Sequence, residues 1–366
     1  MLNSISPLTI APAAVVRGEG VWTASLDRIS SLSRKPLLLG RSAATADCRR
    51  SLQSDLISAG LEPSAGQLEF DCCEQDLQRL AAQFSDCDAV IVAGGGKVLD
   101  AGKLLAHRLK VACITVPLSA STCAGWTALS NLYTSHGAFQ GDVALERCPD
   151  LLIFDHHFVR QAPTRTLASG IADALAKWYE ASVSSGNSAD GLVQQAVQMA
   201  RVLRDQLMID SVEALQTPSS EAWVRVAEAC ALTAGVMGGL GGARCRTVAA
   251  HAVHNGLTQL EACHGSLHGE KVGFGILVQL RLEERLGANR LAAQAHRQLL
   301  PLLQSLGLPV SLDDLGLAGA SLRELQEVCA FACRDGSDLH HLPFPVTPGA
   351  LLEALVGAAE LSPATP

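Results

Sequence analysis

The sequence has few aromatic residues, few charges and no long apolar run, and each shortage excludes a class of protein. Phe, Trp and Tyr make up 4% of the 366 residues, too few for the stacked aromatic side chains that bind single-stranded nucleic acid. The formal net charge of −8 also argues against nucleic acid, because affinity for phosphates comes from clustered Lys and Arg. No stretch reaches the roughly 20 apolar residues of a membrane span. We therefore expect neither a nucleic acid nor a membrane as partner.

Two further features are missing, a signal peptide and a cysteine pair with metal-ligand spacing. The N-terminus lacks a basic start followed by a compact apolar stretch, so we expect a cytosolic (cytoplasmic) protein. The chain has 12 cysteines, but none of them forms a CxxC pair, which argues against a zinc site built on thiolates. In a cytosolic chain we expect these cysteines to be free thiols.

The chain has enough hydrophobic residues to form a large buried core. Hydrophobic residues make up 48% and charged residues 17% of the sequence, and the length corresponds to roughly two domains. Up to about residue 160, β-branched runs alternate with helical patterns. The strand 88–93, a triple glycine, the helix 97–109 and the strand 111–116 form one βαβ unit of a parallel sheet. Residues 161–366 are Ala- and Leu-rich with helical periodicity, so we expect an α/β nucleotide-binding domain (1–160), an all-α domain (161–366) and a cleft between them.

The first motif is the glycine turn in VAGGGKVLD. Three glycines between a strand and a helix let a pyrophosphate approach the backbone, and the helix N-terminus offers unpaired N–H groups. The motif differs from both GxGxxG and GxxxxGK[ST], so a simple tight turn explains it equally well. Asp100 and Lys103 could likewise be surface residues of the following helix.

Histidines and one isolated carboxylate form the second group of motifs. HAVHNG places His251 and His254 on one face of a helix, and His268 follows in LHGEKVGFG. Two imidazoles with a carboxylate suit zinc or ferrous iron and leave positions open for a substrate, whereas surface or capping roles are the alternative. Asp173 lies in the apolar helix GIADALAKWYEA, where a carboxylate needs a partner. That partner is either Lys177, one turn further on, or a metal ion.

Together these segments resemble the iron-containing alcohol dehydrogenase superfamily, and most closely its glycerol dehydrogenase branch. The resemblance runs from VRGEG near residue 20 to FPVT near residue 345, through GGGKxxDxxK, STxAxxxALSxxYT, GxxDALAxWxEA, HAxHNG and HGEKV. It implies a dehydroquinate synthase-like fold, with a dinucleotide, NAD(P)(H), on an N-terminal α/β domain and one divalent metal, Zn²⁺ or Fe²⁺, in the cleft. It also implies a homo-oligomer and a small alcohol or carbonyl substrate.

The resemblance assigns roles by position. The metal ligands would be Asp173, His251 and His268, and His254 beside them would contact the substrate or transfer a proton, so that Asp173 and His254 carry the chemistry. The residues implied around the pyrophosphate are Gly95, Gly96, Lys97 and Asp100. Those implied on the nicotinamide side are Ser119, Ser121, Thr127, Leu129 and Tyr133. The implied reaction is hydride transfer, with the metal acting as a Lewis acid on the substrate oxygen.

Two positions depart from the family pattern. The loop STCAGWTALS resembles STDAPCSALS of glycerol dehydrogenases, so Cys123 stands where an aspartate would contact the polyol, and Trp126 replaces a small residue. We therefore expect a substrate with fewer hydroxyl groups than glycerol. After an early strand, Gly40-Arg41-Ser42 replaces the usual acidic residue. Arg41 favours the 2′-phosphate of NADP(H), unless it only caps the end of the strand.

Two other functions remain open on the sequence alone. A lyase of the dehydroquinate synthase type shares the fold but needs several basic residues around a phosphorylated substrate; the candidates are Lys177, Arg244, Arg246 and Lys271. A dinucleotide- or metal-binding sensor without turnover would explain the altered loop, although it would have little reason to keep the metal ligands. We predict a metal-dependent NAD(P)-linked oxidoreductase that acts on a CH–OH group.

Overall fold

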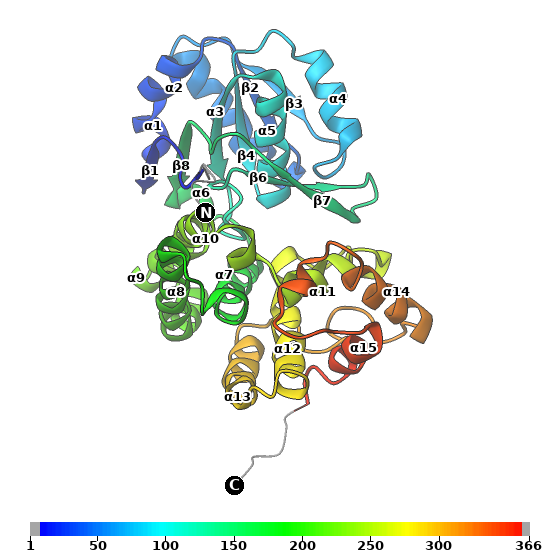
Figure 1. Cartoon of the computed structure of the whole chain (residues 1–366). Helices are drawn as coiled ribbons and strands as arrows, with labels where there is room; N and C mark the ends of the chain where they lie inside the picture. The colour runs from blue at the N-terminus through cyan, green and yellow to red at the C-terminus, as the bar shows by residue number, and fades with distance from the viewer. Residues whose placement is uncertain (1–7, 361–366) are drawn as a thin grey trace. The chain divides into compact units, whose positions relative to one another are not determined.

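The chain folds into two compact units, coloured along the sequence in Figure 1. The computed structural model describes residues 8–360, apart from the side chain of Arg244. The first unit consists of the residues up to Ala162 together with Ala231–Leu240, and the second of Pro163–Cys230 together with the residues from Gly241 onward. The segment Ala231–Leu240, which lies in the helical half of the sequence, thus packs with the α/β half.

The first unit is built on a six-stranded parallel sheet in the order β1-β8-β5-β4-β2-β3. Its strands are β1 (Val15–Gly18), β2 (Pro36–Gly40), β3 (Ser64–Gln67), β4 (Ala89–Gly94), β5 (Ala112–Pro117) and β8 (Leu151–Asp155). Its helices are α1 (Val21–Ala24), α2 (Leu26–Leu32), α3 (Ala46–Ser58), α4 (Glu74–Gln83), α5 (Gly96–Leu109) and α6 (His156–Arg160). The chain passes from β3 back across β2 to β4, so the winding reverses between β2 and β4. Open parallel sheets bind ligands beyond the carboxyl ends of the strands at such a point.

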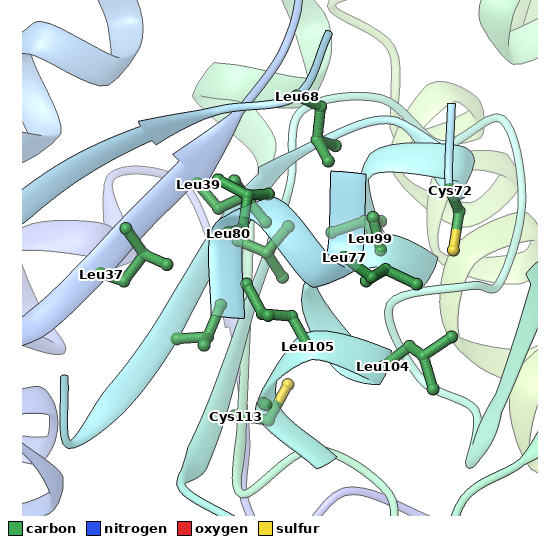
Figure 2. Close-up of a cluster of buried hydrophobic side chains, with 14 of the residues drawn as sticks. Leu37, Leu39, Leu68, Cys72, Leu77, Leu80, Leu99, Leu104, Leu105 and Cys113 are labelled. Atoms are coloured by element: carbon green, nitrogen blue, oxygen red, sulfur yellow. The ribbon is translucent and has the colours of Figure 1, made fainter. Parts of the chain in front are cut away.

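The strands are apolar along their whole length because the sheet is covered on both faces. Figure 2 shows one of the two cores, in which Leu37 and Leu39 of β2 pack with Leu77 and Leu80 of α4. Leu38, between Leu37 and Leu39 in the sequence, belongs to the core on the opposite face of the sheet, because side chains alternate between the two faces along a strand. The parallel sheet predicted from the sequence is confirmed, and the predicted strand–helix–strand unit corresponds to β4, α5 and β5.

An antiparallel hairpin, β6 (Leu129–Tyr133) and β7 (Phe139–Ala144), follows β5 outside the parallel sheet. The hairpin is not predicted from the sequence, because both strands are short and contain several polar residues. Strand β6 packs against α5, and the Ser130 hydroxyl donates a hydrogen bond of 2.9 Å to the Asp100 carbonyl. The hairpin is therefore attached to the helix that begins at the glycine turn.

The second unit is helical, as predicted, and its described residues contain no strand. Its helices are α7 (Thr164–Ser185), α8 (Gly191–Gln216), α9 (Glu221–Glu228), α11 (Ala249–Leu257), α12 (His268–Arg285), α13 (Arg290–Ser305), α14 (Leu322–Ala332) and α15 (Pro348–Val356). Helix α10 (Ala234–Arg246) begins in the first unit and ends in the second. Helix α7 packs against α8 and α12, and α12 packs against α11. These contacts bring the histidine motifs to the helix that carries Asp173.

One helical stretch among the described residues, Glu221–Ala243, has the length and hydropathy of a membrane span. Of its most apolar window, 61% is buried inside the protein, and the helices at the core of globular proteins have the same composition. A π-helical turn at Ala229–Thr233 also interrupts the α-helical geometry. Composition alone therefore does not identify this stretch as a membrane span.

Candidate active site

Helix α7 places three charged side chains on one face. Asp173, Lys177 and Glu180 are spaced four and three residues apart, which corresponds to successive turns of an α-helix. All three are buried, with exposed fractions of 3%, 5% and 0%. The Lys177 ammonium lies 3.2 Å from Asp173 Oδ1, so the ion pair considered from the sequence is present. It does not account for every group that faces Asp173.

Two histidines from other helices face the same carboxylate oxygen. His251 Nε2, from α11, lies 3.3 Å from Asp173 Oδ1, and His268 Nε2, from the first turn of α12, lies 3.6 Å from it. One ligand atom from each of Asp173, His251 and His268 lies within 4.8 Å of the other two. The structure thus brings together the three residues that the resemblance implies as metal ligands, and we call them the triad.

Glu180 holds the first of these histidines in place. Its carboxylate is fully buried and accepts hydrogen bonds from His251 Nδ1 at 2.6 Å and from the backbone N–H groups of His251 and Val248 at 3.0 and 2.7 Å. An imidazole that donates through Nδ1 presents the lone pair of Nε2 to the triad, the arrangement typical of metal-ligating histidines. Glu180 belongs to the GIADALAKWYEA motif, but the motif alone predicts no role for it. Its position seven residues after Asp173 in an apolar helix is the signal that could have found it.

His254 holds the second histidine in the same way. His254 Nε2 lies 3.0 Å from His268 Nδ1, and His254 Nδ1 donates to Asn255 Oδ1 at 2.9 Å. Because Nδ1 of His254 is a donor, its Nε2 accepts from His268 Nδ1, which leaves His268 Nε2 to face Asp173. This contact makes His254 a positioning residue for His268. Substrate contact and proton transfer by His254 stay predictions.

The protonation of these groups suits a cation at the triad. Burial opposes ionisation of Asp173, but the Lys177 ammonium and the hydrogen bonds from the two histidines outweigh it and hold the pKa of Asp173 well below its ordinary value. Burial and the positive groups nearby lower the pKa of His254, so that it is neutral. Burial opposes the charge of His251, but the carboxylates of Glu180 and Asp173 raise its pKa to about 9, so without a metal its Nε2 donates a proton toward Asp173. A divalent cation would replace that proton, and carboxylate O with two imidazole N is a donor set that fits zinc or ferrous iron.

In the first unit, the glycine turn and a serine loop surround the N-terminus of α5. Gly95 is the N-cap of α5 and no side chain caps it, so the first N–H groups of the helix are available to an anion. A Cβ at Gly95 would lie 3.5 Å from Ser119 Oγ, and one at Gly96 would lie 2.8 Å from Thr122 Oγ1. The hydroxyl groups of Ser119 and Ser121 are 3.1 Å apart. Four predicted cofactor residues therefore form one cradle, which fits a pyrophosphate.

Two other predicted cofactor residues, Arg41 and Lys97, meet on one carboxylate that the sequence analysis missed. Asp71, between β3 and α4, accepts a hydrogen bond from the Arg41 guanidinium and one of 2.5 Å from Lys97 Nζ. Lys97 Nζ also lies 4.5 Å from the ring centre of Tyr133. Arg41, Asp71 and Lys97 follow the carboxyl ends of β2, β3 and β4, at the reversal of the winding. A cavity of about 640 Å³ at the ends of β2 and β3 is lined by Arg41, Ser42, Gln67 and Arg79, among others.

Asp100, Thr127 and Leu129 are placed differently, around a buried lysine. Lys103 is 2% exposed; its ammonium lies 3.1 Å from Asp100 Oδ1 and donates to the carbonyls of Thr127 and Leu129. Asp100 and Lys103 are thus core residues and not surface residues of the helix. Within the described residues this cluster joins α5 to β6, and the cofactor roles implied for Asp100, Thr127 and Leu129 stay predictions.

The residues predicted to contact the substrate, Cys123 and Trp126, lie in a turn after β5, in which the Trp126 N–H donates to the Cys123 carbonyl at 2.9 Å. Trp126 is buried; its Nε1 donates to the Ile10 carbonyl at 2.9 Å, and its ring leaves no room for a Cβ on Gly235. The indole therefore has a packing role in the first unit. Cys123 is half-buried, and all 12 cysteines are free thiols.

Two of the basic residues considered for a lyase are engaged with groups of the protein itself. Lys177 is paired with Asp173. Lys271 Nζ donates to the carbonyls of Cys263 and Ser266 at 3.2 and 2.5 Å, which fixes the loop before His268. The side chain of Arg244 lies outside the described part of the chain.

Comparison with known proteins identifies related enzymes. Residues 12–156 match the family described as iron-containing alcohol dehydrogenase. The chain is 51% identical to an uncharacterized oxidoreductase of Synechocystis sp., with 97% of this chain and 94% of the relative covered. It is 32% identical to the glycolaldehyde reductase of Halobacterium salinarum, with 96% of each chain covered. The crystal structure of a probable glycerol dehydrogenase from Sinorhizobium meliloti 1021 has a TM-score of 0.84 and 28% identity, and covers 98% of this chain and 99% of that chain.

Proposed function

This chain belongs to the iron-containing alcohol dehydrogenase family, in its glycerol dehydrogenase-like branch, and is a metal-dependent alcohol or polyol oxidoreductase; from this premise we propose that Asp173, His251 and His268 hold the divalent metal. The observation that carries the proposal is the convergence of one carboxylate oxygen and two imidazole nitrogens within 4.8 Å. The metal is zinc or ferrous iron, since this donor set suits both. When bound, it supplies a Lewis acid for the oxygen of the alcohol or carbonyl.

The side chains of the second unit prepare the triad for that role. Asp173 stays ionised because Lys177 and the histidines favour its carboxylate. Glu180 keeps Nδ1 of His251 protonated, and His254 accepts the Nδ1 proton of His268, so each histidine offers Nε2. Three protein ligands leave coordination positions open, as in catalytic sites.

The edge of the sheet in the first unit is the proposed site of NAD(P)(H), which supplies hydride transfer when bound. The N-terminus of α5, with Gly95, Gly96, Ser119 and Ser121, would bind the pyrophosphate. Tyr133, with Thr127 and Leu129, would lie on the nicotinamide side, and Lys97 and Asp100 complete the set that the resemblance implies. Asp100 acts through Lys103 on the position of β6.

We infer that NADP(H) is preferred because two guanidinium groups line the cavity at the end of β2. Arg41 follows β2, and Arg79 comes from α4; Arg is the side chain best suited to a phosphate. Substitution Arg41→Ala should raise the KM for NADPH about 10- to 100-fold, in keeping with the loss of a charge-assisted hydrogen bond, and should change the KM for NADH much less. Arg50→Ala, at an exposed Arg paired with Asp47 on α3, is the control. A clear preference of the wild type for NADH would contradict the inference.

We propose a substrate with fewer hydroxyl groups than glycerol. Cys123 is a weak hydrogen-bond partner where an aspartate is expected, and the relative from Halobacterium salinarum is a reductase of glycolaldehyde, which has a single hydroxyl group. Substitution Cys123→Asp should therefore raise activity with glycerol. No gain in a folded, metal-loaded variant would count against this choice of substrate.

The experiment that tests the whole proposal measures oxidation of NADPH and NADH by the zinc- or iron-loaded protein with dihydroxyacetone, glyoxals and simple aldehydes. Turnover with a carbonyl that disappears in Asp173→Asn supports it, because the amide is a poor metal ligand. Tight metal and dinucleotide binding without turnover on any carbonyl would contradict it and favour a sensor. We propose further that the protein is cytoplasmic and forms a homo-oligomer. Light scattering on the purified protein tests the oligomeric state.

A further inference from the structure

His268 is the least protected residue of the triad. It is the first residue of α12, and the first residues of a helix lack the backbone hydrogen bonds that hold the interior of the helix. Its side chain is 21% exposed, against 9% for His251 and 4% for Asp173. The contact of His268 with Asp173, which lies on another helix, therefore requires that the first turn of α12 is fixed to α7.

One face of α7 meets this first turn residue by residue. Arg165, Ser169 and Asp173 are spaced four residues apart, which places them on one face of the helix at successive turns. Their partners are three consecutive residues of α12 in reverse order, namely Glu270, Gly269 and His268. A shift at any one of these contacts would therefore change the distance between Asp173 and His268.

The middle contact brings the two backbones close together. The Gly269 N–H donates a hydrogen bond of 3.0 Å to Ser169 Oγ, and Ser169 is fully buried. A Cβ on Gly269 would lie 1.8 Å from the Ser169 carbonyl oxygen, so no other residue fits there. This contact sets how closely the helices approach, but one point of contact does not fix the orientation of the first turn.

The outer contact, made by Arg165, supplies that orientation. The Arg165 guanidinium donates to both oxygens of Glu270, from Nε at 2.5 Å and from Nη2 at 2.7 Å, and Nη2 also donates to the Gly265 carbonyl at 3.1 Å. The Glu270 side chain is 5% exposed, and its Oε2 accepts the Leu267 N–H at 2.7 Å. A bidentate pair of this kind fixes geometry as well as adding energy. One arginine of α7 thus holds the chain on both sides of His268.

We propose that Arg165 is a positioning residue of the metal site, which acts through Glu270 to hold His268 beside Asp173. This rests on the proposed function, since it takes His268 to be a metal ligand. Arg165 cannot be a ligand itself, because a guanidinium offers no lone pair. Loss of Arg165 leaves all three ligands present but His268 less well ordered, so the metal is bound more weakly.

The simpler explanation is that the pair of Arg165 with Glu270 only stabilises the fold. The second unit contains a matched pair with which to test this. Arg225 donates from Nε and Nη2 to the two oxygens of Asp210 at 2.8 and 3.1 Å and joins α9 to α8. Its side chain is 47% exposed and that of Asp210 is 13% exposed, against 58% for Arg165. If only stability matters, Arg165→Met and Arg225→Met should affect metal affinity equally.

The test measures the affinity of the full-length protein for Zn²⁺ by competition with a chromogenic chelator. Arg165→Met should raise the Kd about 10- to 100-fold, as is typical for loss of a group that orients a metal ligand, whereas Arg225→Met should change it less than about threefold. Arg165→Lys keeps the charge but loses the planar fork that binds both carboxylate oxygens. Its Kd should lie between those of the wild type and Arg165→Met.

A double-mutant cycle shows whether the effect passes through His268. His268→Ala removes the ligand, so adding Arg165→Met to it should change the Kd less than about threefold. Adding Arg165→Met to His251→Ala should still produce the full loss, because His268 is then present. The comparison of Arg165→Met with Arg225→Met decides the question even if the ligand variants bind too little metal to measure.

The outcomes separate the two levels of the proposal. A wild type that binds no divalent metal overturns the proposed function. A wild type that binds Zn²⁺, with an unchanged Kd in Arg165→Met or equal losses in Arg165→Met and Arg225→Met, overturns the inference about Arg165 alone. A full further loss in the His268→Ala background overturns it as well. If Arg165→Met does not fold, Arg165→Lys takes its place, and wild-type affinity in that variant counts against the inference in the same way.

Discussion

Single side chains decide how the triad is presented, and Glu180 illustrates this best. It is not a proposed ligand, yet it accepts three hydrogen bonds that fix both the backbone and the ring of His251. His254 accepts a hydrogen bond from His268 Nδ1 and is itself held by Asn255, so these two residues fix the ring of His268. At this scale the function depends on which imidazole nitrogen carries the proton, because only the other nitrogen can be a ligand.

Substitution Glu180→Gln should weaken binding of the divalent metal about 10- to 100-fold. The amide keeps one accepting oxygen in place of two and loses the negative charge that favours the Nδ1–H tautomer of His251. The measurement is metal affinity by competition with a chromogenic chelator. Glu283→Gln is the matched control, since the Glu283 carboxylate is also buried but accepts hydrogen bonds from Gln279 and Asn289 instead of an imidazole. Equal losses in both variants would assign Glu180 to general stability only.

Between elements, buried polar contacts fix helices to their neighbours. Lys103 on α5 reaches Asp100 and two carbonyls around β6, and this contact fixes the hairpin relative to the helix whose N-terminus forms the anion cradle. In the second unit, His296 Nε2 on α13 donates a hydrogen bond of 2.7 Å to the carbonyl of Ala358, just after α15. Both contacts have consequences for stability.

Substitution Lys103→Met should destabilise the protein by about 3–5 kcal/mol, because it leaves the Asp100 carboxylate buried without its ion-pair partner. Urea unfolding measures the loss. The double variant Asp100→Asn with Lys103→Met should recover part of it, since the uncompensated charge is then gone. A single variant as stable as the wild type would show that Asp100 finds another partner.

The stability of the protein should fall as the pH drops below about 6.5, in part because of His296. Burial, with a smaller contribution from Arg281, lowers the pKa of His296 in the folded state. In the unfolded chain this imidazole takes up a proton at a higher pH, so acid favours unfolding between the two pKa values, and no such loss occurs above the unfolded value. Urea unfolding at pH 7 and pH 5 should show a smaller loss for His296→Gln than for the wild type. His136→Gln, at an exposed histidine, is the control and should lose as much stability between pH 7 and pH 5 as the wild type. An equal loss in His296→Gln would contradict a contribution of His296 to acid unfolding.

At the scale of the whole molecule, the two proposed sites take their residues from different units. The residues proposed for the dinucleotide lie in the first unit, and those proposed for the metal lie in the second. Each group of residues is held by the core of its own unit. The metal and the cofactor should therefore stabilise different parts of the chain.

Removal of the metal with a chelator should destabilise the second unit selectively. A ligand present at 100 times its Kd stabilises the folded state by about 2.7 kcal/mol. Hydrogen exchange followed by mass spectrometry should therefore become faster in α7, α11 and α12 of the metal-free protein, while β2, β4 and β5 change little. Addition of NADPH should protect the N-terminus of α5 instead. Uniform changes along the chain in both experiments would contradict a division of the two sites between the units.

The sequence by itself determined the parallel sheet and the helical second unit, because both follow from short-range patterns: continuous β-branched runs and helical periodicity. It also indicated the family, through the resemblance of its motifs. The resemblance carried by these motifs also implied Asp173, His251 and His268 as metal ligands. Asp100 and Lys103 show the limit of such reasoning, since their helix has both polar and apolar sides and only the packing of β6 decides that they are buried.

Only the tertiary structure decided which groups meet across the sequence. Asp71 lies 30 residues from Arg41 and 26 from Lys97, and no local pattern relates it to either. The pairing of Glu180 with His251, 71 residues away, and the convergence of Lys177 with two histidines on one oxygen depend on the packing of α7 against α11 and α12. Hydrogen bonds and charges act over a few ångströms of space whatever the distance along the chain. The residues proposed as ligands could therefore be named from the sequence, whereas their protonation and the charge around them arise only in the fold.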